Sequence, residues 1–136
     1  MVDEVRVLRW LRALTDDLTV LRQEAVADEQ RRGDPLWLAG IKYTFLTAIE
    51  ACLDVAQHFC SSEGWGPPRD NGDAMTLLGR HGVLEPEFAQ RMRRAVGFRN
   101  VLVHEYVDVD DGIVLSRLAD FEDLEQFAHE VARHIE

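Results

Sequence analysis

Residues 35–60 read PLWLAGIKYTFLTAIEACLDVAQHFC, and this stretch decides the fold class. Asp34 and Pro35 are a favourable N-cap and first-turn pair, so they predict a helix that begins here. Apolar side chains cover most of the circumference of this helix, which is typical of a helix in the middle of a bundle. Cys52 and Cys60 lie eight residues apart on its apolar stripe, which favours core thiols over metal ligands.

Residues 2–32 precede this helix, and their apolar residues recur at steps of three and four. That spacing predicts one long amphipathic helix, which Gly33 ends. The predicted buried stripe consists of Val2, Val5, Leu8, Leu11, Leu14, Leu18 and Leu21.

Three further segments follow the central helix. Residues 61–72 predict a Gly/Pro-rich loop, residues 73–81 a short helix closed by Gly82, and residues 86–105 a longer helix that opens with Pro86. Helical spacing also runs from about residue 110 to the C-terminus, with Asp120 as an internal cap, although VDVDDGIVL could instead be extended. We therefore predict an all-α fold, an antiparallel bundle of four long helices and one short helix, in a single domain over residues 1–136.

The composition narrows the class of protein. The 136 residues include 25 acidic and 15 basic ones, a net charge of −10, which argues against a broad basic surface for nucleic acid but not against a small basic cleft. No apolar run reaches the roughly 20 residues of a membrane span, and the charged start MVDEVRVLRW is unlike a signal peptide. With only two cysteines as well, the sequence indicates a cytoplasmic protein without membrane contact.

The stretch RMRRAVGFRNVLVHEY, residues 91–106, is the most informative for function. It places four arginines within nine residues, with no acidic residue among them, just before His104. At about 100° per residue, Arg93, Asn100 and His104 share one face of the predicted helix, whereas Arg99 lies on an apolar side about 140° from His104. An arginine on an apolar side is costly unless it is paired or lies at an interface.

Residues 99–106, RNVLVHEY, resemble the Arg-x4-His-x-Tyr signature of the HepT-like toxins in the HEPN superfamily. The surrounding GFRNVLVHEYVDVD, the TAIEACLDVAQHF of the central helix and the order of the predicted helices are also similar to that family. The resemblance implies an HEPN-like all-α fold and the toxin component of a toxin-antitoxin system of type II or type VII character.

The same resemblance implies an activity and its control. The chain would be a metal-independent endoribonuclease that acts on cellular RNA, mRNA or tRNA, and would form a homodimer whose two motifs face a shared cleft. A nucleotidyltransferase antitoxin of the MNT type would neutralise it by transferring AMP from ATP to Tyr106. ATP would therefore serve the partner, and the chain itself would need no cofactor.

The motif residues suit that chemistry. His104 can move protons near neutral pH, and Arg99 can hold the negative charge that develops on a phosphate. Asn100 could orient His104 or donate to the phosphate, and Arg93 on the same face would support phosphate binding. The attacking group would be the 2′-hydroxyl of the RNA itself. No cluster of residues has the spacing of metal ligands, so no metal site is predicted.

Other interpretations of these residues stay open. A non-catalytic helical module that partners a nucleotidyltransferase would suit the net charge of −10. A purely structural dimer would use Arg99 only to brace its interface. Glu50 and Asp54, four residues apart on the central helix, are expected to pair with arginines of the motif helix, and Trp65 in the loop is expected to pack rather than to stack on bases.

Overall fold

The computed structural model describes residues 1–104 and 109–136. Within these residues the fold is all-α, as predicted, with seven helices and no strand. The helices are α1 (Glu4–Glu24), α2 (Glu29–Arg32), α3 (Pro35–Ser62), α4 (Asn71–Arg80), α5 (Pro86–His104), α6 (Asp111–Ala119) and α7 (Glu122–Ile135).

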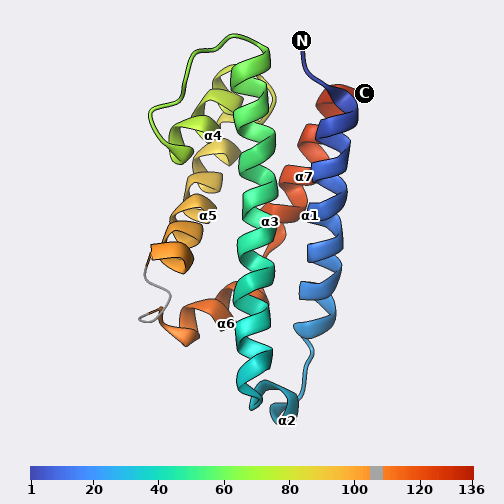
Figure 1. Cartoon of the computed structure of the whole chain (residues 1–136), viewed down its shortest axis with the longest axis vertical. Coiled ribbons are helices and arrows are strands. Elements are labelled where there is room, and N and C mark those ends of the chain that lie inside the picture. The colour runs from blue at the N-terminus through green and yellow to red at the C-terminus, as the bar shows by residue number, and fades with distance from the viewer. Residues whose placement is uncertain (105–108) are drawn as a thin grey trace.

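Helix α3 is the centre of the bundle, as its apolar composition predicts. It runs the length of the molecule with α1 along one side and α5 along the other, and it also contacts α4 and α7 (Figure 1). Twelve of its residues are buried, including Cys52 and Cys60, so both cysteines are core thiols. Helix α3 is long and apolar enough to cross a membrane, by length and composition alone. This finding corrects the expectation that no segment reaches that length, although the core helix of a soluble protein meets the same criteria.

The N-terminal half of the predicted α1 stripe is wrong. Val5 and Leu8 are 68% and 52% exposed, whereas Val7 is fully buried. Successive steps of three residues drift about 60° backward around a helix, so the predicted stripe winds away from the core. The alternating steps of four and three in the observed stripe stay on one face; that stripe consists of Val7, Leu11, Leu14, Leu18 and Leu21.

The predicted single helix over residues 2–32 is in fact two helices. Helix α1 ends at Glu24, and Asp28 caps the short α2 by accepting a hydrogen bond from the backbone N–H of Arg31 at 2.9 Å. The Arg32 guanidinium donates to the carbonyls of Ala25 and Ala27 at 2.9 and 3.0 Å. These contacts satisfy the backbone where the helix breaks, so a continuous helix is not required.

The remaining boundaries follow the predicted signals with small shifts. Asp34 caps α3, and α5 opens with Pro86. Helix α4 begins at Asn71, two residues before the predicted start, because Asp70 is its N-cap. Asp120 interrupts the C-terminal segment as predicted and separates α6 from α7, and residues 111–115 of the possible extended stretch belong to α6. The prediction of four long helices and one short helix is therefore corrected, because α2 and α6 are separate helices.

Candidate functional site

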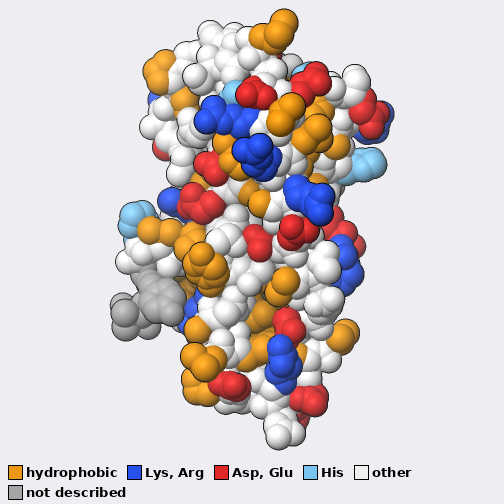
Figure 2. All heavy atoms as spheres, turned by 45° about the vertical axis from the view of Figure 1, so that its right-hand side comes forward, with side chains coloured by type: hydrophobic (Ala, Val, Ile, Leu, Met, Phe, Trp, Pro, Cys, Tyr) orange, Lys and Arg blue, Asp and Glu red, His pale blue; other side chains and the backbone are white. Residues whose placement is uncertain are grey.

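Four of the predicted site residues line one cavity of about 410 Å³ between α4 and α5. Arg93, Arg99, Asn100 and His104 come from α5, and residues 70–72 at the start of α4 form the opposite wall. The face seen in Figure 2 mixes basic and acidic side chains, so no broad basic surface covers it. The small basic cleft that the composition left open is thus present at the motif.

Arg99 is held in place by the central helix. Its Nε donates to Oε1 of Glu50 on α3 at 2.5 Å, and its Nη1 donates to Oδ1 of Asn100 at 3.1 Å. The Arg99 side chain is only 19% exposed, so the predicted ion pair with Glu50 offsets the cost of partly burying its charge. Asp54, the other predicted partner, makes no ion pair with a described residue, and burial together with the nearby Glu50 raises its pKa.

Arg93 is positioned by α4. Its Nη1 donates to the hydroxyl of Thr76 at 2.8 Å, and the guanidinium lies against Gly72. A Cβ atom at Gly72 would approach Cζ of Arg93 to 3.3 Å, so glycine gives this arginine room. The carboxylate of Asp70 accepts from the backbone N–H of Asp73 at 2.7 Å and is therefore engaged within α4.

His104 is the last residue of α5 and is exposed at the end of the cavity. No hydrogen bond joins Asn100 to His104 in the described residues; Oδ1 of Asn100 accepts from Arg99, and its amide N–H groups can still donate to a phosphate. The angle of about 140° between Arg99 and His104 does not separate them, since both line the same cavity. The long arginine side chain accounts for this, because it reaches around the helix further than its Cα position indicates.

The four arginines of the motif stretch are divided between two faces of α5. Arg93 and Arg99 face the cavity just described, whereas Arg91 and Arg94 line a second cavity between α5 and α7. The two cavities share no lining residue. Half of the basic cluster is therefore not part of the predicted site.

The weaker candidates are structural in the described part of the chain. Residues 1–104 and 109–136 contain no group of three His, Cys, Asp or Glu side chains that could hold a metal ion. Burial raises the pKa of the Cys52 thiol, which makes it a poor ligand or nucleophile. Trp65 packs as expected, stacked on His81 with ring centroids 4.2 Å apart.

Sequence reasoning missed the contribution of α4 to the site. Asn71 and Gly72 line the cavity, and Thr76 binds Arg93. The available signal was the Asp70 cap at the end of a long Gly/Pro-rich loop, because functional residues often lie where such loops meet a helix. Tyr106, the predicted modification site, lies outside the described residues.

Comparison with known proteins gives a consistent result. A family model described as "Ribonuclease HepT-like" matches residues 9–131. The chain is 33% identical to an mRNA nuclease HepT of Shewanella oneidensis over 57% of its length, and 34% identical to a tRNA nuclease HepT of Aphanizomenon flos-aquae over 52%. These matches span 59% and 48% of the two relatives.

The fold also has a close counterpart among solved structures. A tri-AMPylated HEPN toxin of Shewanella oneidensis, in complex with an MNT antitoxin, superposes with a TM-score of 0.84 at 24% identity. The superposition covers 98% of this chain and 99% of the other. At this identity the likeness establishes the HEPN fold.

Proposed function

Because this chain belongs to the ribonuclease HepT-like family, we propose that it is a toxin that cleaves cellular RNA, mRNA or tRNA, in the cytoplasm. The observation that carries this proposal is the single cavity that gathers Arg93, Arg99, Asn100 and His104. One of these residues can transfer protons, and two carry a fixed positive charge. These groups are sufficient for cleaving RNA by attack of a ribose 2′-hydroxyl on the neighbouring phosphodiester.

The cleavage step requires a base, charge stabilisation and an acid. His104 takes the proton of the 2′-hydroxyl as the 2′-oxygen attacks phosphorus, and the imidazolium so formed gives that proton to the 5′-oxygen as the bond from phosphorus to the 5′-oxygen breaks. Arg99 stabilises the extra negative charge on the phosphate through N–H groups not used by Glu50 and Asn100. Arg93 binds a neighbouring phosphate. The products are a 2′,3′-cyclic phosphate and a 5′-hydroxyl, and none of these steps requires a metal ion.

A homodimer completes the site in this proposal. The cavity is open on one side, and large apolar side chains lie exposed on the neighbouring helices: Leu36 at 79%, Tyr43 at 66% and Val103 at 41%. A second copy that covers them would bring two motif helices to one cleft and bury apolar surface. In sedimentation experiments Tyr43→Glu is expected to shift the protein from dimer to monomer, whereas Val5→Glu, in the first turn of α1 and 68% exposed, leaves the dimer intact.

Control by a partner is the remaining part of the proposal. A nucleotidyltransferase of the MNT type binds the toxin and transfers AMP from ATP to Tyr106, which follows His104 by two residues. The solved complex of a tri-AMPylated HEPN toxin with an MNT antitoxin supports this chemistry for the present chain. Each AMP adds negative charge close to Arg99, where it competes with the phosphate of RNA.

Growth of expressing cells tests the proposed function. Wild-type protein produced without the antitoxin should arrest growth, and co-production of its MNT-type nucleotidyltransferase should relieve the arrest. Arg99→Ala and His104→Ala should each abolish toxicity while the protein stays folded and dimeric. Unimpaired growth with soluble, folded wild-type protein would instead favour the non-catalytic partner module.

A further inference from the structure

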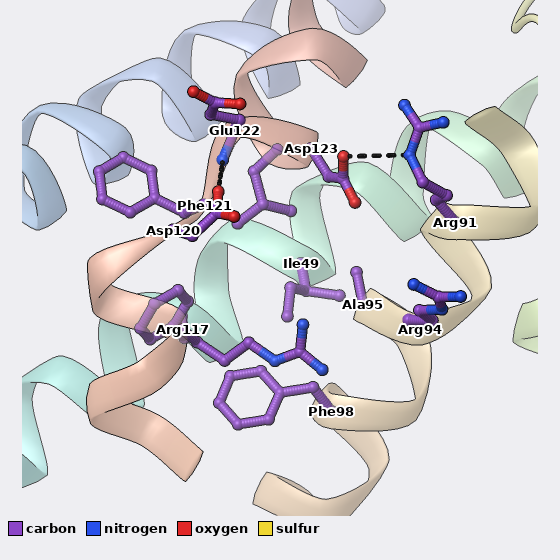
Figure 3. Close-up of a pocket in the computed structure, with 12 residues that line it drawn as sticks. Ile49, Arg91, Arg94, Ala95, Phe98, Arg117, Asp120, Phe121, Glu122 and Asp123 are labelled. Carbon is purple, nitrogen blue, oxygen red and sulfur yellow. Dashed lines mark hydrogen bonds and ion pairs between the residues drawn. The ribbon is translucent and has the colours of Figure 1, made fainter. Parts of the chain in front are cut away.

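The second cavity, on the other face of α5, has a volume of about 350 Å³ and lies between α3, α5, α6 and α7 (Figure 3). We call it the α5–α7 pocket; Arg91, Arg94, Ala95 and Phe98 of α5, Arg117 of α6 and residues 120–124 line it, over Phe45 and Ile49 of α3. Its volume is at the lower end of the range of about 300–1,000 Å³ for small-molecule pockets. The α5–α7 pocket therefore has room for one small ligand.

The floor of this pocket is apolar and buried. Ile49 and Phe98 are 1% and 7% exposed, and Phe45 lies edge-on to Phe98 with ring centroids 5.5 Å apart. In Figure 3 Ile49, Ala95 and Phe98 lie between α3 and α5. Such a floor favours a flat, uncharged group such as an aromatic ring.

Two cations at the pocket have no carboxylate partner. Arg94 and Arg117 make no ion pair or side-chain hydrogen bond with residues 1–104 or 109–136. The Arg117 guanidinium lies over the ring of Phe98, 5.7 Å from its centroid, and the Arg117 side chain is exposed. Arg91, by contrast, is engaged with Asp123 at 3.5 Å and with Gln126 at 3.3 Å.

The acidic residues at the rim make no ion pair with Arg94 or Arg117. Asp123 is paired with Arg91, and one oxygen of Asp120 accepts from the backbone N–H of Glu122 at 3.3 Å. The Glu122 carboxylate points away from the floor in Figure 3. The pocket therefore offers positive charge beside an apolar floor, with carboxylate oxygens at its edge that can accept from an amine.

We propose that the α5–α7 pocket binds a single nucleotide unit, with the base on the apolar floor against Arg117 and the phosphate between Arg94 and Arg117. A planar base fits the apolar floor and stacks on the Arg117 guanidinium. A phosphate matches the forked guanidinium groups. Bases with an exocyclic amine are preferred over uracil, because the amine can donate to Asp120 at the rim.

This nucleotide unit is either a free nucleotide or one residue of a bound RNA. The second source rests on the proposed function, since it makes the pocket an additional contact for the RNA cleaved at His104. Arg93 and Arg94 are neighbours in the sequence but line different cavities, so one turn of α5 would contact the RNA on both faces. The pocket itself contains none of the residues assigned to cleavage.

Calorimetric titration tests the proposal with 5′-AMP, 5′-UMP, ribose 5-phosphate and a short 2′-O-methyl RNA that cannot be cleaved. The test variant is Arg94→Gln/Arg117→Gln, whose two exposed side chains carry no ion pair to lose. Arg9→Gln removes one exposed arginine of α1 as a control, outside both the pocket and the proposed cleavage site.

We expect wild type and Arg9→Gln to bind alike, and the double variant to bind at least about tenfold more weakly. Loss of AMP binding identifies a free nucleotide, and loss of RNA binding alone identifies a residue of RNA. Equal binding by the double variant and wild type, no binding of any probe, or ribose 5-phosphate binding as tightly as AMP overturns the proposal. Because binding is measured without cleavage, its failure leaves the proposed ribonuclease activity standing.

Discussion

Gly79 on α4 should resist substitution because α4 and α5 approach unusually closely there. A Cβ atom at Gly79 would lie 2.6 Å from Cβ of Ala89 and 3.4 Å from Cα of Pro86. Ala89 is fully buried, so its methyl group cannot move aside without shifting the helix. Gly79→Ala therefore forces α4 away from α5, the two helices that form the walls of the candidate site.

The size of the effect follows from two opposing contributions. Overpacking costs about 1–3 kcal/mol, and alanine in place of glycine within a helix returns about 0.8–1 kcal/mol. We expect a net loss of up to about 2 kcal/mol in the free energy of unfolding, which lowers Tm by up to about 8 °C for a chain of this size. RNA cleavage should fall as well, because the contact between Arg93 and Thr76 spans the same two helices.

Thermal and urea unfolding measure the effect, with two companion variants. Gly40→Ala is the control, since nothing lies within 4 Å of a Cβ atom at this helical position and the variant should gain up to about 1 kcal/mol. Gly79→Ala/Ala89→Gly moves the methyl group from α5 to α4 and should recover most of the loss. If Gly79→Ala stabilises the protein as Gly40→Ala does, the close approach of α4 and α5 is wrong.

Three further predictions concern single side chains. Glu50→Gln should keep the cleavage rate within about threefold of wild type, because its amide oxygen can still accept from Arg99. Glu50→Ala should lower kcat about tenfold, because Arg99 is no longer held in position. Equal kcat values for wild type and both variants would show that Arg99 does not depend on Glu50. Burial raises the pKa of the Asp17 carboxyl, so the folded state binds its proton more readily and stability falls as pH rises through the window just above about pH 4. Asp17→Asn, which can still accept from Thr47, should therefore be more stable by less than about 1 kcal/mol at pH 7 and no more stable below about pH 3, as followed by urea unfolding. Tyr106→Phe should stay folded, retain cleavage and gain no AMP mass when incubated with the antitoxin, ATP and Mg²⁺; equal labelling of wild type and variant would place the modification elsewhere.

The sequence predicts the helices best where one residue carries the signal. Asp34 caps α3 and Pro86 opens α5, because both effects act within one turn and need no tertiary contact. The end of α1 depends instead on Arg32 reaching back to backbone carbonyls five and seven residues away. No hydrophobic pattern contains that information, so the break between α1 and α2 could not be predicted.

The candidate site divides in the same way. The helical wheel places Arg93, Asn100 and His104 together, and all three line the cavity. The α4 wall of the cavity depends on how closely α4 and α5 pack. The sequence does not contain that distance, which becomes visible only where Gly79 faces Ala89 in the structure. The wheel also overstates the separation of Arg99 from His104, because it shows where a Cα atom lies and not how far an arginine side chain reaches.

End-group analysis of cleaved RNA tests the central claim most directly. Wild type, Arg99→Ala and His104→Ala are incubated with RNA in excess EDTA, and the fragments are identified by mass spectrometry. If His104 and Arg99 act together on one phosphate, wild type yields 2′,3′-cyclic phosphate and 5′-hydroxyl ends, and the two folded variants yield neither. Full cleavage by either variant, or fragments with 3′-hydroxyl and 5′-phosphate ends that form only after Mg²⁺ is restored, would contradict the account.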